Sequence, residues 1–222
     1  MHDGIMRHFA LIDEMKSSSF KSVLDIGGLP QSHKNFFPKV RFTILNLTSP
    51  KKYKDNKFVK GSVLKIPFKN NTFDLIVSSD MMEHILRKNR KKAIDEIIRV
   101  SSKKIILVFP CGKKSQSSEK IVLFVGKFFG RKMRWLSEHK ECGLPMISEI
   151  EQIINSNKKV KSLEVKQNFN ICLWLLFSLI SPMFRIALKN VNRTKLYKNW
   201  NWFFKLFSFG TGYRGVFIID LK

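Results

Sequence analysis

The sequence predicts an α/β fold in which a mostly parallel sheet of seven strands carries helices on both faces. Between residues 22 and 109, short apolar runs alternate with polar or helical segments, as they do in βα units. These runs lack strict alternation of apolar and polar residues, which is typical of strands buried on both faces. Two further strand-like runs come late in the chain, and they predict an antiparallel strand at the edge of the sheet.

The first half of the chain supplies five of the expected strands. They lie at residues 22–26, 41–47, 57–60, 73–78 and 104–109. A helix is expected over residues 88–100, because its apolar residues recur on one face while the other face is basic. Residues 1–19 predict an amphipathic N-terminal helix by the same spacing.

The second half is less regular, but it supplies further helices and the last two strands. Helices are expected over residues 119–129 and 146–157, and strands over 160–165 and 215–221. Ser148 and Glu151 have the spacing of a capping box at the start of the second of these helices. We expect one domain over 1–222: an N-terminal helix (1–19), a core (20–110), a lid or substrate segment (111–145), a helical insertion (167–212) and a final strand (213–222).

The composition is that of a globular chain with a large positive charge. Hydrophobic residues make up 44% and charged residues 26%, and the formal net charge is +24. Such a charge suits nucleic acid, an anionic membrane surface or an acidic substrate, although compositional drift toward lysine explains it equally well. Three cysteines are too few for a disulfide framework, and no Cys/His spacing indicates zinc. With no signal peptide expected at the start, we predict a cytoplasmic protein.

The insertion before the last strand is apolar, then aromatic and basic. Residues 167–184 carry no charge, and residues 189–209 mix lysine and arginine with tryptophan, tyrosine and phenylalanine. Apolar side chains, Trp and flanking cations suit a helix at a membrane surface. Packing against the domain's own core or in a dimer explains the pattern equally well. A membrane-spanning helix conflicts with the fold, because it would separate the last two strands.

Four motifs follow one another in the first half of the chain. VLDIGG is followed by RFTILNL, then by GSVLKIPFKNNTFDLIVSSDMMEHI, and then by EIIRVSSKKIILVFP. The set resembles the class I S-adenosylmethionine-dependent methyltransferases, particularly the small "type 11" group. The resemblance covers about residues 20–110, and Trp135–Pro145 looks like a segment of some members. It implies a Rossmann-like fold with S-adenosylmethionine as the cofactor.

The resemblance places the methionine and ribose parts of the cofactor on the first two strands. Asp25, Gly27 and Gly28 would line its methionine end, where glycines let backbone N–H groups approach a ligand. Asn46 and Leu47, at the end of the second strand, would reach the ribose hydroxyls. The family usually has a carboxylate at the position of Asn46, because an ionised oxygen pair accepts from both hydroxyls.

The remaining cofactor positions come from the segments before and after the fourth strand. Ser62 stands where the family has an Asp beside the adenine amino group, and Val63 can offer its backbone. Ser79 would face the reacting centre. The glycine-rich turn also departs from the family, since it reads Leu29-Pro30-Gln31. Together the departures predict weakened cofactor binding, and a non-catalytic member of the family is an open alternative.

Three residues, Asp80, His84 and His139, are candidates for catalysis. Asp80, Glu83 and His84 form an Asp-x-x-Glu-His cluster, and a similar cluster binds a divalent metal in some small-molecule O-methyltransferases of this fold. Here Asp80 and His84 are assigned catalytic roles. The alternatives are that Asp80 caps a helix and that Glu83 and His84 have structural roles. No residue is assigned as a metal ligand. His139 is the third candidate, either touching substrate or lying at the surface of a lid. Cys111 is interpreted as filler.

The implied activity is methyl transfer to a small-molecule, lipid or lipid-linked glycan acceptor. The basic and aromatic insertion would hold the protein at the cytoplasmic membrane surface, where lipid-type acceptors are presented. An RNA methyltransferase, in which lysines bind phosphate, is the alternative enzyme. Against it, the chain is richer in lysine than in arginine, whereas nucleic-acid recognition favours arginine. A binding protein that kept the fold and lost catalysis is the third reading.

Overall fold

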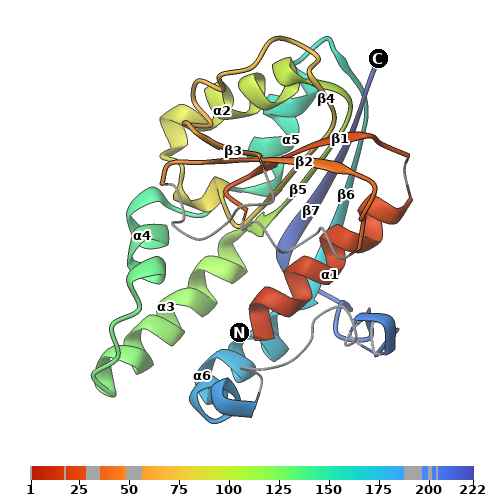
Figure 1. Cartoon of the computed structure of the whole chain (residues 1–222). Coiled ribbons are helices and arrows are strands. Elements are labelled where there is room, and N and C mark those ends of the chain that lie inside the picture. The colour runs from red at the N-terminus through yellow and green to blue at the C-terminus, as the bar shows by residue number, and fades with distance from the viewer. Residues whose placement is uncertain are drawn as a thin grey trace.

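The computed structural model contains one seven-stranded sheet, in the strand order β3-β2-β1-β4-β5-β7-β6 (Figure 1). It describes residues 2–17, 19–28, 36–48, 57–187, 197–199, 202–203 and 205–222. β1 to β5 are parallel to one another, whereas β7 is antiparallel to both of its neighbours, β5 and β6. The predicted fold class, including the reversed strand, is therefore confirmed. The strands are β1 (Ser22–Ile26), β2 (Arg41–Asn46), β3 (Lys57–Lys60), β4 (Phe73–Ser79), β5 (Ser101–Pro110), β6 (Val160–Asn170) and β7 (Gly212–Leu221).

Helices cover both faces of this sheet. The helices are α1 (His2–Lys16), α2 (Arg87–Val100), α3 (Lys113–Phe128), α4 (Arg134–Cys142), α5 (Ile147–Asn155) and α6 (Ile171–Ala187), with a 3-10 turn η1 (Met82–His84). Successive strand residues face opposite sides, so Ile76 packs with α2 and α5, while Leu75 and Val77 pack with α1. This arrangement leaves the carboxyl ends of the parallel strands open for a site.

Some boundaries differ from those expected. α3 begins at Lys113, directly after Gly112, whose φ of +90° turns the chain out of β5. The capping box at Ser148 is wrong, because α5 begins at Ile147, its N-cap is Met146, and no side chain caps it. Helix α4 occupies part of the segment expected as a lid.

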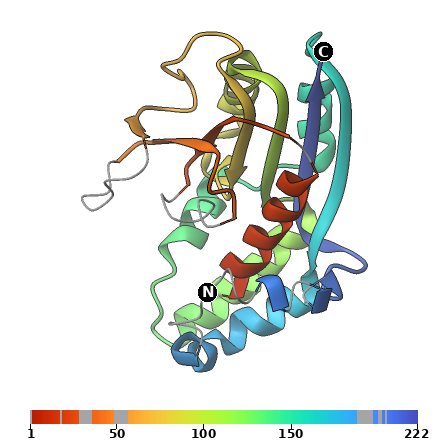
Figure 2. The ribbon, with the colours of Figure 1, turned by 45° about the vertical axis from the view of Figure 1, so that its right-hand side comes forward.

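α3 and α6 extend together beyond the carboxyl end of the sheet (Figures 1 and 2). Trp174 of α6 is fully buried and stacks on Tyr213, with ring centroids 3.8 Å apart. One face of α6 is therefore packed on the domain's own core, as one of the two interpretations of this segment expects. Among the described residues, no helix has the length and apolar character needed to cross a membrane. Most of 188–201, including Arg193 and Lys195, lies outside the described residues.

Candidate functional site

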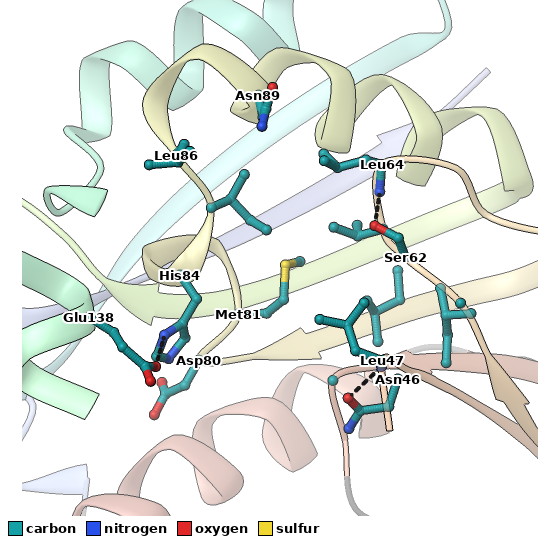
Figure 3. A pocket seen from close by; sticks show the side chains of 16 residues that line it. Asn46, Leu47, Ser62, Leu64, Asp80, Met81, His84, Leu86, Asn89 and Glu138 are labelled. Atoms are coloured by element: carbon teal, nitrogen blue, oxygen red, sulfur yellow. Dashed lines mark hydrogen bonds and ion pairs between the residues drawn. The ribbon is translucent and has the colours of Figure 1, made fainter. Parts of the chain in front are cut away.

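A pocket of about 560 Å³ lies at the carboxyl ends of β1, β2 and β4 (Figure 3). In open α/β sheets this edge is where ligands bind, because the loops there converge from several strands. Seven of the residues predicted for the site line it: Gly27, Asn46, Leu47, Ser62, Val63, Asp80 and His84. Asp25, Gly28, Ser79 and His139 do not line it. The strand ends thus gather residues that lie up to 57 positions apart in the sequence.

The Asp25 side chain packs against the backbone of the turn that follows β1, at Gly28. Asp25 is buried, and a Cβ added to Gly28 would lie 2.0 Å from its Oδ2 atom, so only glycine leaves room for this carboxylate. Gly27 has a φ of +77° and donates its N–H to Leu45 O at 2.8 Å. A positive φ favours glycine, so both glycines are required by the turn itself. The expected departure at Leu29–Gln31 lies outside the described residues.

Asn46 and Ser62, where the resemblance leads one to expect carboxylates, are partly occupied by their own loops. Asn46 Oδ1 accepts the N–H of Leu47 at 2.8 Å, and Ser62 Oγ accepts the N–H of Leu64 at 3.2 Å (Figure 3). The Gly61 N–H donates to Asn46 O at 3.0 Å and fixes the two loops against each other. A ligand here meets the remaining lone pairs and the Asn46 amide hydrogens, which is a weaker acceptor set than two carboxylates.

Asp80 is held by two arginines from distant parts of the chain. Arg214 Nε lies 2.9 Å from Asp80 Oδ1 and its Nη2 lies 3.1 Å from Oδ2, and Arg7 also bonds Oδ2. Asp80 has a φ of +50°, and its N–H donates to Val108 O at 2.8 Å. η1 has Met81 as its N-cap and no side-chain cap, so the capping alternative for Asp80 is wrong. Its contacts favour a positioning role over proton acceptance.

Behind Asp80, Glu83 and His139 form a buried pair. Glu83 has no exposed surface, and its Oε1 lies 3.9 Å from Nε2 of His139, which is itself 3% exposed. The pKa of Glu83 is raised well above its usual range by burial and by the neighbouring charge of Asp80. His139 Nδ1 lies 2.9 Å from Glu119 Oε1. His139 is therefore an interior residue and not a surface histidine of a lid.

His84 joins this pair to the pocket. Its ring centroid lies 4.8 Å from that of His139, and its Nδ1 lies 3.2 Å from Glu138 Oε2. Figure 3 shows His84 and Glu138 directed toward each other at one end of the pocket. Burial, and then the neighbouring His139, lower the pKa of His84.

Several contributors to this end of the site escape sequence reasoning. Arg90 is buried and holds the α4–α5 connection, donating to Cys142 O at 3.1 Å and lying 3.3 Å from Glu149 Oε2. Arg7, Glu119 and Arg214 likewise come from segments with no local motif. Cys111 stays a poor nucleophile, because burial raises its pKa to about 12.

The comparisons with known proteins agree with this geometry. Residues 43–109 match a family model described as a methyltransferase domain. A segment of 78 residues is 37% identical to an uncharacterized protein of Methanocaldococcus jannaschii, and it covers 35% of this chain and 33% of that protein. The match therefore spans about a third of the curated relative.

Solved structures share the fold over nearly the whole chain. The plantazolicin methyltransferase BpumL, in complex with SAH (S-adenosylhomocysteine), is 12% identical with a TM-score of 0.60, over 100% of this chain and 84% of that chain. The YcgJ protein of Bacillus subtilis is 16% identical with a TM-score of 0.54, over 97% and 98%. Residues 43–109, which supply most of the pocket wall at the strand ends, thus match a methyltransferase domain, and the chain has the fold of the solved methyltransferase BpumL.

Proposed function

We propose that the protein transfers a methyl group from S-adenosylmethionine to a lipid-type or other small acceptor at an anionic membrane surface. The pocket carries the proposal, because most of its wall residues lie within the segment that matches the methyltransferase domain. A volume of about 560 Å³ falls within the range of cofactor pockets. BpumL, a relative in fold, was solved with SAH and with a desmethyl plantazolicin analogue.

In this proposal the cofactor lies along the ends of β1 and β2. Its methionine end meets Gly27 above the buried Asp25, and its ribose meets Asn46 and Leu47. Its adenine reaches the loop at Ser62 and Val63. Asp25 and Gly28 act by shaping the turn, since neither lines the pocket. Ser79, also outside the pocket wall, supports the loop at Asp80.

The acceptor then lies at the end bounded by Asp80 and His84. S-adenosylmethionine would supply the methyl group, and Asp80 and His84 would hold the acceptor's lone pair beside it, with the acceptor's proton passing to water or a base. Most of the rate of such a displacement comes from holding the two reactants in line. Of the three predicted catalytic residues, His84 and Asp80 line the pocket, and His139 stands behind His84.

A membrane surface is favoured by the exposed end of α3. Phe124, Phe128 and Phe129 are exposed there, Phe128 to 82%, next to the exposed Lys120 and Lys127. Monomeric proteins seldom leave such aromatic groups in water without a partner. Aromatic and basic side chains together suit an anionic bilayer, and the net charge of +24 has the matching sign. RNA would use the lysines and leave the phenylalanines unexplained.

Vesicle binding tests the membrane part of this proposal. The Phe124→Ser/Phe128→Ser variant should lose co-sedimentation with phosphatidylglycerol vesicles, and Lys120→Gln/Lys127→Gln should weaken it. A matched pair, Lys158→Gln/Lys161→Gln, removes two exposed lysines at the start of β6 and should bind as the wild type does. Wild-type binding by the phenylalanine variant would reject this surface.

The acceptor class is tested with methyl-labelled S-adenosylmethionine. The protein is incubated with a lipid extract and, separately, with total RNA. Label in the organic phase supports the lipid-type acceptor. Label in precipitated RNA would reject it in favour of the RNA methyltransferase, and label in neither, together with no cofactor binding, would favour the non-catalytic protein.

A further inference from the structure

Glu83 has a fully buried carboxyl group whose two oxygens have no hydrogen-bond partner among the described residues. Buried polar atoms are nearly always paired, because an unpaired group loses its water without compensation. Its neighbour Asp80 supplies no hydrogen bond to Glu83, since the Asp80 oxygens accept hydrogen bonds from Arg7 and Arg214. Glu83 therefore indicates a missing partner at this position.

His139 directs a nitrogen at this carboxylate. Its Nδ1 lies 2.9 Å from Glu119 Oε1, which also accepts the hydroxyl of Tyr213 at 2.5 Å. With Nδ1–H donating to Glu119, Nε2 keeps its lone pair, and this lone pair faces Glu83 Oε1 at 3.9 Å. A carboxylate that fixes the far nitrogen of a histidine is the usual support of a metal-binding imidazole.

His84 is arranged in the same way at the side of the pocket. Its Nδ1 lies 3.2 Å from Glu138 Oε2, which leaves the other ring nitrogen available. One donor atom from each of Glu83, His84 and His139 lies within 4.8 Å of the other two. The His84 side chain is 35% exposed and lines the pocket, so the cluster opens toward the acceptor end.

We propose that Glu83, His84 and His139 bind one divalent transition-metal ion, of the Zn²⁺ or Co²⁺ type, at the acceptor end of the pocket. Two imidazoles and one carboxylate are a common ligand set for these ions, and they leave a coordination position open. Bonds of about 2.1 Å in a tetrahedral site place donor atoms about 3.4 Å apart. The Glu83–His139 separation of 3.9 Å is close to this, and the half-exposed His84 supplies the remaining movement.

The surrounding charges suit a cation at this point. Glu119 and Glu138 stand behind the two histidines, and Asp80 is already neutralised by its arginines. A metal here would polarise an acceptor oxygen bound beside it. This site goes beyond methyl transfer, because its existence does not depend on the cofactor.

Metal binding is measured on the full chain after EDTA treatment, with no cofactor present. Titration with Co²⁺ should give visible ligand-field bands that saturate at one ion per chain, and Zn²⁺ should displace it. Glu83→Gln and His139→Asn should each weaken Co²⁺ binding at least a hundredfold. Glu119→Gln should weaken it about 10- to 100-fold, as loss of an outer-shell carboxylate does.

Two controls separate this site from adventitious binding and from misfolding. Glu141→Gln removes an exposed carboxylate from α4, the helix that holds His139. Cys142→Ser removes the thiol whose Sγ lies 3.4 Å from His84 O, and both variants should bind Co²⁺ as the wild type does. Circular dichroism in EDTA should show every variant folded. No bands with the wild type, or unchanged bands in Glu83→Gln and His139→Asn, would overturn the site. A separate SAH titration keeps that result distinct from failure of the methyltransferase proposal.

Discussion

The two ends of the pocket are built in different ways. The cofactor end comes from consecutive strand–loop units, so Gly27, Asn46 and Ser62 each follow a strand that can be recognised locally. The acceptor end joins α1, η1, α4 and β7, where Asp80 meets Arg214 across 134 positions. Local patterns therefore predict the first end, and only the folded chain assembles the second.

Breaking the Asp80 network should have the largest effect. Asp80→Asn removes the negative charge that faces the buried Arg214 (1% exposed), and removing one charge of a buried ion pair costs about 3–5 kcal/mol of unfolding free energy. Methyl transfer should fall as well, because the loop before His84 loses its anchor. Urea unfolding and turnover of the variant measure the two effects.

An exposed pair is the matched control for this prediction. Asp95→Asn removes the partner of Lys91 at 2.6 Å on the outer face of α2, and such surface pairs contribute about 0–1 kcal/mol. Equal losses of unfolding free energy in the two variants would show that the ion pairs of Asp80 contribute no more to stability than an exposed pair does.

Restoring a carboxylate should sharpen the contrast at the cofactor end. Asn46→Asp adds a charged acceptor where the ribose is proposed to lie, and charge-assisted hydrogen bonds contribute about 1.5–3 kcal/mol. SAH affinity should rise about tenfold or more, by calorimetry. Asn89→Asp adds the same charge to another wall of the pocket and should have a smaller effect. An unchanged affinity in Asn46→Asp would place the ribose elsewhere.

The smallest expected effect lies at the opposite end of the same strands. The backbone N–H of Lys21, and then Lys103, lower the pKa of Asp74 to about 2. Because the folded pKa lies below the unfolded one, the stabilisation is present above about pH 4 and is lost as the pH falls toward 2. After allowance for its partial exposure, Asp74→Asn should cost about 1 kcal/mol at pH 7 and almost nothing near pH 2. Urea midpoints at the two pH values measure it, and an equal loss at both would contradict the assignment.

The sequence was sufficient for the sheet and for the residues that the strand ends bring to the pocket wall, and insufficient for the contacts at the end near Asp80. The strand runs carry their own signal, because burial on both faces demands continuous apolar residues, and all seven expected strands are found. Asn46 and Ser62 could be located because each follows a strand in a matched motif. Arg7, Glu119 and Tyr213 could not, since their roles arise from contacts between segments and leave no local pattern. His139 was found as a residue, but its burial depends on the packing of α4 against η1.

The proposed function depends on S-adenosylmethionine binding in this pocket beside Asn46 and Ser62. Calorimetric titration with S-adenosylmethionine and with SAH tests it most directly. We expect both ligands to bind at one site per chain with micromolar affinity, and Asn46→Asp to strengthen the binding. No detectable binding at millimolar ligand, in the wild type and in Asn46→Asp alike, would contradict it and leave a methyltransferase fold without its cofactor.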